Sequence, residues 1–530
     1  EFYNQLNEKL DCDITWIRPD HNDYYNYVEQ AFTSGDMPDV VLLSKDYLDY
    51  YAYNGYLWNM SEAWNNSKTL NSDKLSDYAV KYIEANGSAY FSDGKKGMYG
   101  FTPQRSQGTV TYIKASELRK AGYDPEVIKN ANLTFDEYYD ILKKIKKNTS
   151  EDYILSPPGF YMNVGTSSYR TQFLPEFYQN AEWSFYRNAD GEFVDGFTEQ
   201  AMIDAINRIK TAVNDKIIEK SAQNHTTSTS RLMFRRNDGG DSKVFSYYCG
   251  AWGNTLRVTN DSTGADSELI AIKPVNNGKY IDSLRITWAI VDKKDGRQQQ
   301  IFDRFIDTML DGRDIQMLWT YGAKGTHWDT KAETITVGSK SYSYQEGEFH
   351  RLPKLDNKKA FNSRNFIDPV CALSDFDDDM LDGQVVNPVD KLEYAKEVKE
   401  ELDMFLDNSV FEIEVPYTPV LGENITDINT VRGLVVDQVV LGNWTIEYAM
   451  AQYDEMVGKK VEAVLEGFKE YTFNEKSSIT DIIKNNNLEY IVNKDSSGKQ
   501  MLTGVKPELK ADYLKTGFGD NIVIKNADGT

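Results

Sequence analysis

The sequence predicts an α/β fold divided between at least two domains, and three observations lead to this prediction. The chain has 530 residues, more than one hydrophobic core normally holds. Hydrophobic residues make up 40% of the chain, which is enough to fill several cores. Segments with helical and strand periodicity alternate over residues 1–115, and the alternation begins again after residue 114.

The first predicted elements are a helix, a strand, a second helix and a second strand. Residues 1–10 place three apolar side chains on one helical face. Residues 14–17 predict a strand, and residues 24–35 predict a helix that ends at a glycine. The order of strand, helix and strand that continues to residues 40–43 is typical of α/β folds.

The apolar run Val40–Leu43 follows Gly, Asp and Pro residues and stops abruptly at a polar segment. A run of four apolar residues between turn signals predicts a strand that is buried on both faces. Ligands of open α/β sheets lie just beyond the carboxyl ends of such strands. Asp46 and Tyr47, at the start of an aromatic-rich helix, are therefore candidate ligand contacts.

The next segments lead to a predicted crossing between two lobes. We expect Ser61 to cap a short helix. Two extended segments, residues 98–103 and 110–113, flank the polar loop 104–108. Because the alternation restarts after them, we place the crossing near residue 114.

The later segments repeat the same pattern. Thr134 and Glu137 have the spacing of a capping box and open a helix over residues 138–147. Residues 331–385 predict an irregular polar region, and the final 60 residues match no pattern. The other predicted elements are a hairpin around 188–192, helices at 202–213, 232–234, 301–310, 391–406 and 427–468, and strands at 244–248 and 286–291.

Charge and cysteine usage narrow the class of protein. The formal net charge of −23 disfavours nucleic acids and anionic membranes as partners, because affinity for both depends on Lys and Arg clusters. No segment approaches the roughly 20 apolar residues of a membrane span. Cys12, Cys249 and Cys371 match no metal or redox spacing, so we expect buried thiols.

No catalytic motif is present in the sequence. The 4 histidines match no zinc spacing, and no P-loop, GxSxG or GxGxxG segment occurs. We therefore expect a protein that is not an enzyme, with the histidines at the surface or behind the site. A glycoside hydrolase remains an alternative, because it needs only two carboxylates roughly 5–10 Å apart.

An acidic segment is the main candidate metal site, and Asn188–Gly191 is a weaker one. Asp375, Asp377 and Asp379 lie at alternate positions, as the oxygen ligands of calcium often do. The segment lacks the central glycine and the closing glutamate of a calcium-binding loop. The sequence therefore favours a solvated acidic loop over a calcium site, and we expect no cofactor.

Aromatic residues suggest the ligand. The chain has 35 tyrosines, and many of them flank predicted strand ends. An aromatic ring with a polar group offers a flat apolar face to the C–H groups of a sugar and a hydrogen bond at its rim. A single ring belongs more often to a core, so the argument depends on placement, which is most suggestive for Trp252, Tyr169 and Asp46.

Six segments in this order resemble the extracellular solute-binding proteins of ABC sugar importers, in the group that includes maltose-binding protein and larger oligosaccharide and alginate binders. The resemblance covers roughly residues 1–460. The six segments are "AFTSGDMPDVV", "YGFTPQRSQGTVTYIKASELRKAGYDPE", "LTFDEYYDILKKIKKN", "DGEFVDGFTEQAMIDAINRIKTAV", "YYCGAWGNTL" and "WTYGAKGTHW".

The resemblance implies a two-lobed periplasmic-binding-protein-like α/β fold with a central cleft and a hinge. The implied N-terminal lobe comprises residues 1–114 and 284–328, and the C-terminal lobe comprises residues 115–283 and 329–460. Two departures from the family pattern affect these assignments. The family's first strand is missing ahead of Glu1, and residues 461–530 extend past the family's usual end.

The resemblance also implies ligand-binding roles for particular residues. Asp46 matches a carboxylate that accepts hydrogen bonds from sugar hydroxyls, and the segment with Arg105 and Gln107 matches one that touches sugar. The rings implied to stack on sugar or to reach the cleft are Tyr169, Trp252 and Tyr417.

The implied function is to bind an oligosaccharide in the cleft, close on it by hinge motion and deliver it to an ABC transporter permease. We expect a neutral glycan of several sugar units, because the acidic balance disfavours polyanions, while Arg105 and Arg257 leave a uronate open. A peptide-binding importer component is an alternative, because it would have the same lobes.

The family resemblance further implies an extracellular monomer that is lipid-anchored at the surface of a monoderm bacterium. The sequence opens in what reads as the inside of a helix. We therefore expect that an export signal and a linker have been removed ahead of it.

Overall fold

This computed structural model forms two compact units, residues 1–92 with 96–467 and residues 93–95 with 468–530. The structure describes residues 1–20, 23–72, 75–106, 108–161, 173, 184–188, 190–235, 242–310, 313–337, 340–352, 373, 395–411, 415–485, 491–494, 500–503 and 522–525.

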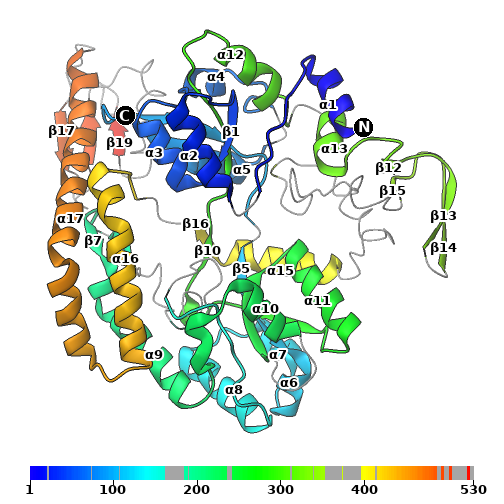
Figure 1. The fold of residues 1–530 in the computed structure, drawn as a ribbon, viewed down its shortest axis with the longest axis vertical. Helices are drawn as coiled ribbons and strands as arrows, with labels where there is room; N and C mark the ends of the chain where they lie inside the picture. Colours follow the sequence, from blue (N-terminus) through cyan, green and yellow to red (C-terminus); the bar gives the residue numbers. More distant parts are fainter. Residues whose placement is uncertain are drawn as a thin grey trace. The chain divides into compact units, whose positions relative to one another are not determined.

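The described elements alternate between helices and strands along the first unit (Figure 1). The α-helices are α1 (Phe2–Leu10), α2 (Tyr24–Ser34), α3 (Lys45–Tyr53), α4 (Ser61–Asn65), α5 (Asp77–Gly87), α6 (Ala115–Lys120), α7 (Pro125–Asn130), α8 (Phe135–Lys147), α9 (Gln200–Asn214), α10 (Thr227–Arg235), α11 (Ala251–Thr263), α12 (Gln298–Ile301), α13 (Arg313–Tyr321), α15 (Ala395–Asp407), α16 (Pro419–Val440) and α17 (Ile446–Asn485). Short 3₁₀ helices are η3 (Gly196–Thr198), η4 (Lys220–Asn224) and η5 (Val275–Asn277), and η6 (Phe302–Ile306) is a π-helix.

The described strands are short. They are β1 (Val40–Leu43), β2 (Ser88–Tyr90), β3 (Lys96–Met98), β4 (Gly100–Phe101), β5 (Thr109–Lys114), β6 (Phe185–Arg187), β7 (Phe193–Asp195), β8 (Val244–Tyr248), β9 (Leu269–Ile272), β10 (Tyr280–Asp282), β11 (Thr287–Ile290), β12 (Trp328–Asp329), β13 (Glu333–Val337), β14 (Lys340–Tyr344), β15 (His350–Arg351), β16 (Ser409–Phe411), β17 (Ile491–Lys494), β18 (Gln500–Thr503) and β19 (Ile522–Lys525).

The first sheet has the order β1-β11-β4. Strand β11 is antiparallel to both neighbours, so β1 and β4 run parallel to each other. Leu43 at the end of β1 pairs with Thr287 at the start of β11, and Phe101 at the end of β4 pairs with Trp288. The carboxyl ends of β1 and β4 therefore lie at the same end of the sheet.

Helices pack their apolar faces against this sheet as the sequence predicts. Phe2, Leu6 and Leu10 of α1 are all buried, and the ring of Phe2 meets that of Trp319 in α13 at 5.8 Å. Helix α2 ends at Gly35, whose φ of 79° is the left-handed conformation that glycine adopts readily. The predictions for α1 and α2 are confirmed.

The second sheet has the order β8-β5-β9, with β5 antiparallel to both neighbours. Thr109 at the start of β5 pairs with Tyr248 at the end of β8. Because β5 belongs to this sheet, the connection between the two sheets is residues 102–108, ahead of the crossing that the sequence placed near residue 114.

The Tyr82 hydroxyl links this connection to a second one, which follows β10. The Tyr82 hydroxyl of α5 accepts a hydrogen bond from the Ser106 amide at 2.7 Å and donates one to the Ser283 carbonyl at 2.9 Å. Strand β10, which precedes the second connection, pairs in parallel with β16. Two segments, distant in sequence, therefore link the two sheets.

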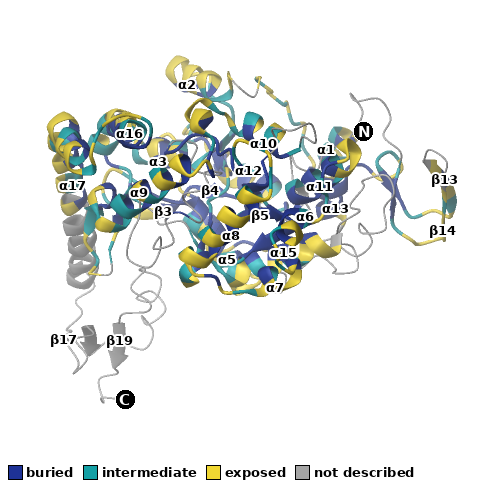
Figure 2. Cartoon of the chain, turned by 90° about the horizontal axis from the view of Figure 1, so that it is seen from below, coloured by how far each residue is buried: buried dark blue, intermediate teal, exposed yellow. Residues whose placement is uncertain are grey.

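The helices α16 and α17 lie side by side (Figure 1), and a buried arginine joins them to strand β7. Arg432 donates to Asp195 at 2.7 Å and to the Tyr453 hydroxyl at 3.1 Å, and Tyr453 donates to Asp195 at 2.8 Å. Figure 2 shows exposed residues on the outer turns of these helices. The helices predicted over residues 427–468 are confirmed, with an earlier start at Pro419.

Three sequence predictions were wrong or incomplete. Residues 14–17 form no strand, because no strand ladder joins them to another described segment. Trp16 instead contacts other rings, such as Trp288 at 6.5 Å. Ser61 is the first residue of α4 and not its cap, and its hydroxyl donates to Asn59 at 2.6 Å. In the region predicted as irregular, β13 and β14 form a hairpin.

The second unit contains strands that the sequence did not predict. Strand β18 pairs antiparallel with β17 and parallel with β19. Among the described helices of the whole chain, none combines the length and the apolar composition that a bilayer crossing requires.

Candidate ligand-binding site

Two of the predicted contact residues follow strands that end together. Asp46 comes after β1 and Arg105 comes after β4, so both leave the same end of the first sheet. Asp46 is exposed in the first turn of α3, where the helix dipole favours a negative charge. Arg105 is 5% exposed, and its guanidinium donates to the Ser106 carbonyl at 3.2 Å.

Helix α3 is held by a buried ion pair beside Asp46. Lys45 pairs with Asp49 one turn later and donates to the Ser88 carbonyl at 2.8 Å. Leu48 is fully buried against the sheet. This anchoring leaves Asp46 and Tyr50, which are one turn apart, on the exposed side of the helix.

Tyr417 packs against the same helix. Its ring meets Tyr50 edge-on at 5.7 Å and Tyr53 at 5.4 Å. The ring is half-buried, and this burial raises the pKa of Tyr417. The structure therefore brings Tyr417 to the helix that carries Asp46.

A tyrosine and an aspartate lie near Arg105 at the connections. The Tyr78 hydroxyl donates to Asp282 at 2.6 Å, and burial together with the charge of Asp282 raises the pKa of Tyr78 well above its usual range. The positive charge of Arg105 acts in the opposite direction on that pKa. Gln107 and Tyr169 lie outside the described residues.

Trp252 follows β8 at the corresponding end of the second sheet. The Cys249 amide donates to the Gly108 carbonyl at 3.1 Å, which places the start of α11 next to the connection 102–108. Gly250 has a φ of 64°, a conformation that lets the chain turn from β8 into α11. Trp252 is half-buried, and its ring meets Tyr247 edge-on at 5.9 Å.

A buried ion pair fixes the helix that carries Trp252. Arg257 pairs with Glu401 of α15 and donates to the Leu269 carbonyl at 3.0 Å, while the Tyr112 hydroxyl donates to Glu401 at 2.9 Å. A Cβ on Gly253 would overlap the Tyr112 hydroxyl, so α11 packs closely here. Arg257 is 1% exposed and already paired, which corrects the expectation that it could receive an acidic ligand.

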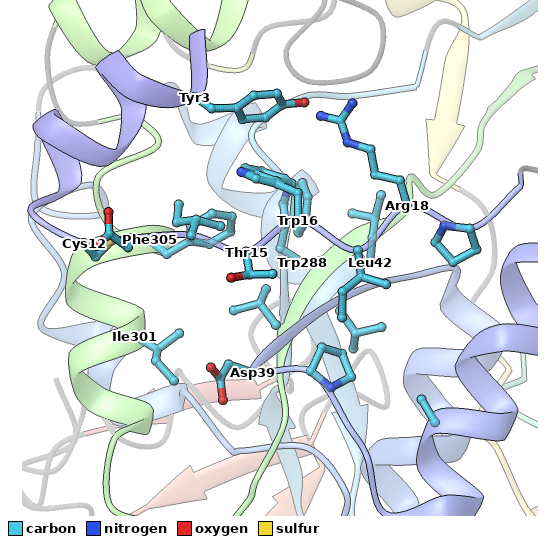
Figure 3. Close-up of a pocket in the computed structure, with 18 of the residues that line it drawn as sticks. Tyr3, Cys12, Thr15, Trp16, Arg18, Asp39, Leu42, Trp288, Ile301 and Phe305 are labelled. Carbon is cyan, nitrogen blue, oxygen red and sulfur yellow. The ribbon is translucent and has the colours of Figure 1, made fainter. Parts of the chain in front are cut away.

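A cavity of 1440 Å³ lies along β1, and Asp46, Arg105, Trp252 and Tyr417 are not among its lining residues. Its lining includes the rings of Trp16, Trp288 and Phe305, which lie together in Figure 3. The Tyr24 hydroxyl also lines it and is already bonded to the Leu42 backbone, donating at 2.8 Å and accepting at 3.2 Å. The lining is mixed, because charged side chains such as Arg18 and Asp39 lie around the same space as these rings (Figure 3).

The cavity also explains an error about β1. The sequence predicted a strand buried on both faces, but Val40 and Leu42 are only half-buried, and both line the cavity. Val41 and Leu43 are buried as predicted.

The titratable residues show no metal centre in the described part of the chain. No group of three or more His, Cys, Asp or Glu side chains there could hold a metal ion. Asp375, Asp377 and Asp379 lie outside the described residues. Cys249 is buried as expected, Cys12 is half-buried, and His350 is fully buried against Glu333, although a surface position or one behind the site was expected.

Sequence reasoning missed several residues of this region. Arg231 of α10 donates to the Tyr247 hydroxyl at 2.9 Å, and its guanidinium lies 5.3 Å from the centre of the Trp252 ring. The sequence predicts Tyr50 only as part of an aromatic-rich helix, and Tyr53 is not among its predicted residues. Two features of the sequence could have indicated these residues. They are the repeated tyrosines after β1 and the two arginines on α10.

Comparisons with known proteins show the fold and a family that part of the chain resembles. The family model described as "Bacterial extracellular solute-binding protein" matches residues 1–241, which confirms the resemblance found in the sequence. No curated protein matches the sequence. Three solved structures with two-lobed folds resemble the chain, and this similarity confirms the predicted fold class.

These three structures are similar over most of their length. The N-glycan transport solute-binding protein of Streptococcus pneumoniae is 14% identical, with a TM-score of 0.56 over 89% of this chain and 95% of its own. An alginate-binding protein without calcium is 15% identical, with a TM-score of 0.56 over 89% and 94%. An HMO-binding, ABC-transporter-associated protein of Bifidobacterium longum infantis is 13% identical, with a TM-score of 0.56 over 88% and 95%.

Proposed function

We propose that this chain, whose first 241 residues match the extracellular solute-binding proteins, binds an oligosaccharide of several sugar units and delivers it to the permease of an ABC transporter. It acts outside the cell, held by a lipid anchor, and works as a monomer without chemistry of its own. Similar structures include proteins named for N-glycan, alginate and HMO binding, which supports a glycan as the ligand class.

The observation that carries this proposal is the half-buried ring of Trp252 at the start of α11. It lies beyond the end of β8 and beside the connection between the two sheets. Its position is fixed by the buried Arg257–Glu401 pair behind it, so the ring is held ready before a ligand arrives. A rigid aromatic face is suited to the C–H groups of a sugar ring.

A second group of contacts comes from the first sheet. Asp46 supplies a carboxylate that accepts hydrogen bonds from sugar hydroxyls, and the exposed ring of Tyr50 with Tyr417 supplies a further apolar surface. Arg105, Gln107 and Tyr169 complete the proposed contacts. Hinge motion about the connections, including residues 102–108, closes the two groups on the glycan.

A thermal-shift panel tests this function. The panel holds neutral oligosaccharides, acidic oligosaccharides, peptides and calcium, because a ligand of the native state raises the melting temperature by mass action. We expect a glycan to raise the melting temperature and to remain intact after prolonged incubation. A shift with peptides alone would contradict the proposal, and reducing ends that accumulate with time would indicate a glycoside hydrolase instead.

A further inference from the structure

Two arginines of α10 have no carboxylate partner among the residues that the structure describes. Arg231 and Arg235 are four residues apart, so they share one face of the helix, and both are half-buried. Arg119, Arg257 and Arg432 each pair with a carboxylate, but no ion pair joins Arg231 or Arg235 to one within the described part of the chain. Like charges at this spacing destabilise a helix, so the two arginines do not stabilise α10.

Neutral aromatic groups hold the first of these arginines. The Arg231 guanidinium donates to the buried Tyr247 hydroxyl at 2.9 Å and lies over the Trp252 ring at 5.3 Å. A hydroxyl and a ring face orient a guanidinium without neutralising it. Arg231 therefore lies beside the tryptophan proposed to contact sugar, and its contacts here are a hydroxyl and a ring.

The second arginine has an unsatisfied donor. The Nε atom of Arg235 is buried and has no hydrogen-bond partner within the described ranges. Burial, and then the positive charge of Arg231, lower the pKa of Arg235. A buried donor without an acceptor is unfavourable, and an anion bound nearby would supply both the acceptor and the missing charge.

We propose that Arg231, Arg235 and Trp252 form a subsite for an anionic sugar residue, one that carries a carboxylate or a sulfate. The inference rests on the proposed glycan-binding function and names its substrate class. A planar guanidinium binds a carboxylate or sulfate through paired hydrogen bonds, while Trp252 contacts the sugar ring. The net charge of −23 disfavours anionic ligands in general, but charges beyond a Debye length of about 8–10 Å are largely screened. The local arginines therefore determine the charge preference of the subsite.

Calorimetric titration with matched ligands tests the subsite. Uronate and sialylated oligosaccharides are each compared with their carboxyl-reduced neutral counterparts, and sulfated oligosaccharides with desulfated ones. We expect at least one acidic ligand to bind about tenfold or more tightly than its neutral counterpart, with an affinity that falls as salt is added. If the uronate or sialylated ligands show this preference, the subsite binds a carboxylate. If the sulfated ligands show it, the subsite binds a sulfate.

The variants are Arg231→Gln and Arg235→Gln. Arg119→Gln is the matched control, because Arg119 of α6 makes an exposed ion pair with Glu268, which precedes β9. Loss of the acidic preference in both variants, with the preference kept in the control, supports the subsite. Equal binding of acidic and neutral counterparts, or a preference that survives in both variants, overturns it and leaves the glycan-binding function standing.

Two further outcomes are also decisive. If no acidic or neutral glycan binds, the proposed function and the subsite both fail. Circular dichroism shows whether each variant folds. If one does not, the salt dependence of acidic-ligand binding to the wild-type protein is measured in place of that variant. An affinity for the acidic ligand that is independent of salt overturns the subsite.

Discussion

Asp437 shows how a single carboxyl group sets part of the pH dependence of stability. Burial on α16 raises the pKa of Asp437 to about 6 from a usual 3.8. In the native state the ionised form is therefore disfavoured, and the cost is fully present above pH 6 and disappears as the pH falls through 6 towards 4.

Asp437→Asn should consequently stabilise the protein at pH 7.5, and the gain in melting temperature should shrink between pH 6 and pH 4. Thermal melts of both proteins across this range measure the difference. Asp427→Asn is the control on the same helix, because Asp427 is exposed and pairs with Lys460, so it should show no such gain. A gain that grows at low pH would show that the sign of the shift is wrong.

Residue roles at the site were only partly predictable from the sequence. The placement of Asp46 and Trp252 after strands could be predicted, because each follows an apolar run with a clear end. The pairing of Arg257 with Glu401 could not, because 144 residues separate the partners and no local pattern marks either of them. For the same reason Arg257 was mistaken for a residue that a ligand could reach.

At the scale of elements, Gly108 marks the point where the connection enters β5. Its φ is 71°, and a Cβ there would overlap the ring of Phe405 in α15. Gly108→Ala should therefore destabilise the protein by ~2–4 kcal/mol, from backbone strain and overpacking together. Urea denaturation measures this loss.

Gly122 is the matched control for Gly108. It has a φ of 83°, and a Cβ there would meet open space. Gly122→Ala should cost only the backbone term, ~1–2 kcal/mol. Equal losses in the two variants would mean that Phe405 does not restrict residue 108.

The ion pair behind α11 predicts a strong asymmetry between single and double substitutions. Arg257→Met leaves Glu401 buried without its charge partner and should cost ~3–5 kcal/mol, measured by urea denaturation. Arg257→Met with Glu401→Leu should recover much of this loss, because no unpaired charge remains. Additive losses in the double variant would contradict the account of α11.

Whole elements were predicted best where the signal was local. The capping box of Thr134 and Glu137 is present as expected, because its two hydrogen bonds join residues three apart. Residues 14–17 were misread because an apolar run predicts extended backbone but not whether a ladder partner lies beside it. Strands β17 to β19 carry no clear alternation, which is why the sequence did not reveal them.

At the scale of the whole molecule, we expect the first unit to close on its ligand. The two sheets of the first unit are joined by two connections, an arrangement that permits hinge bending. Small-angle X-ray scattering should show a smaller radius of gyration when a glycan identified by the thermal-shift panel is added. An unchanged radius at saturating glycan would contradict hinge closure, and a non-binding glycan of equal size serves as the control.

The central claim is that Trp252 holds a glycan, and a glycan array probed with the wild-type protein and with Trp252→Ala tests it most directly. Trp444→Ala is the control for removal of a half-buried tryptophan elsewhere. We predict that the wild-type protein and the control bind the same set of oligosaccharides, and that Trp252→Ala loses about tenfold or more in affinity, since stacking contributes ~1 kcal/mol beyond the buried area. Binding by Trp252→Ala that equals the wild type, or no binding to any glycan, would contradict the claim.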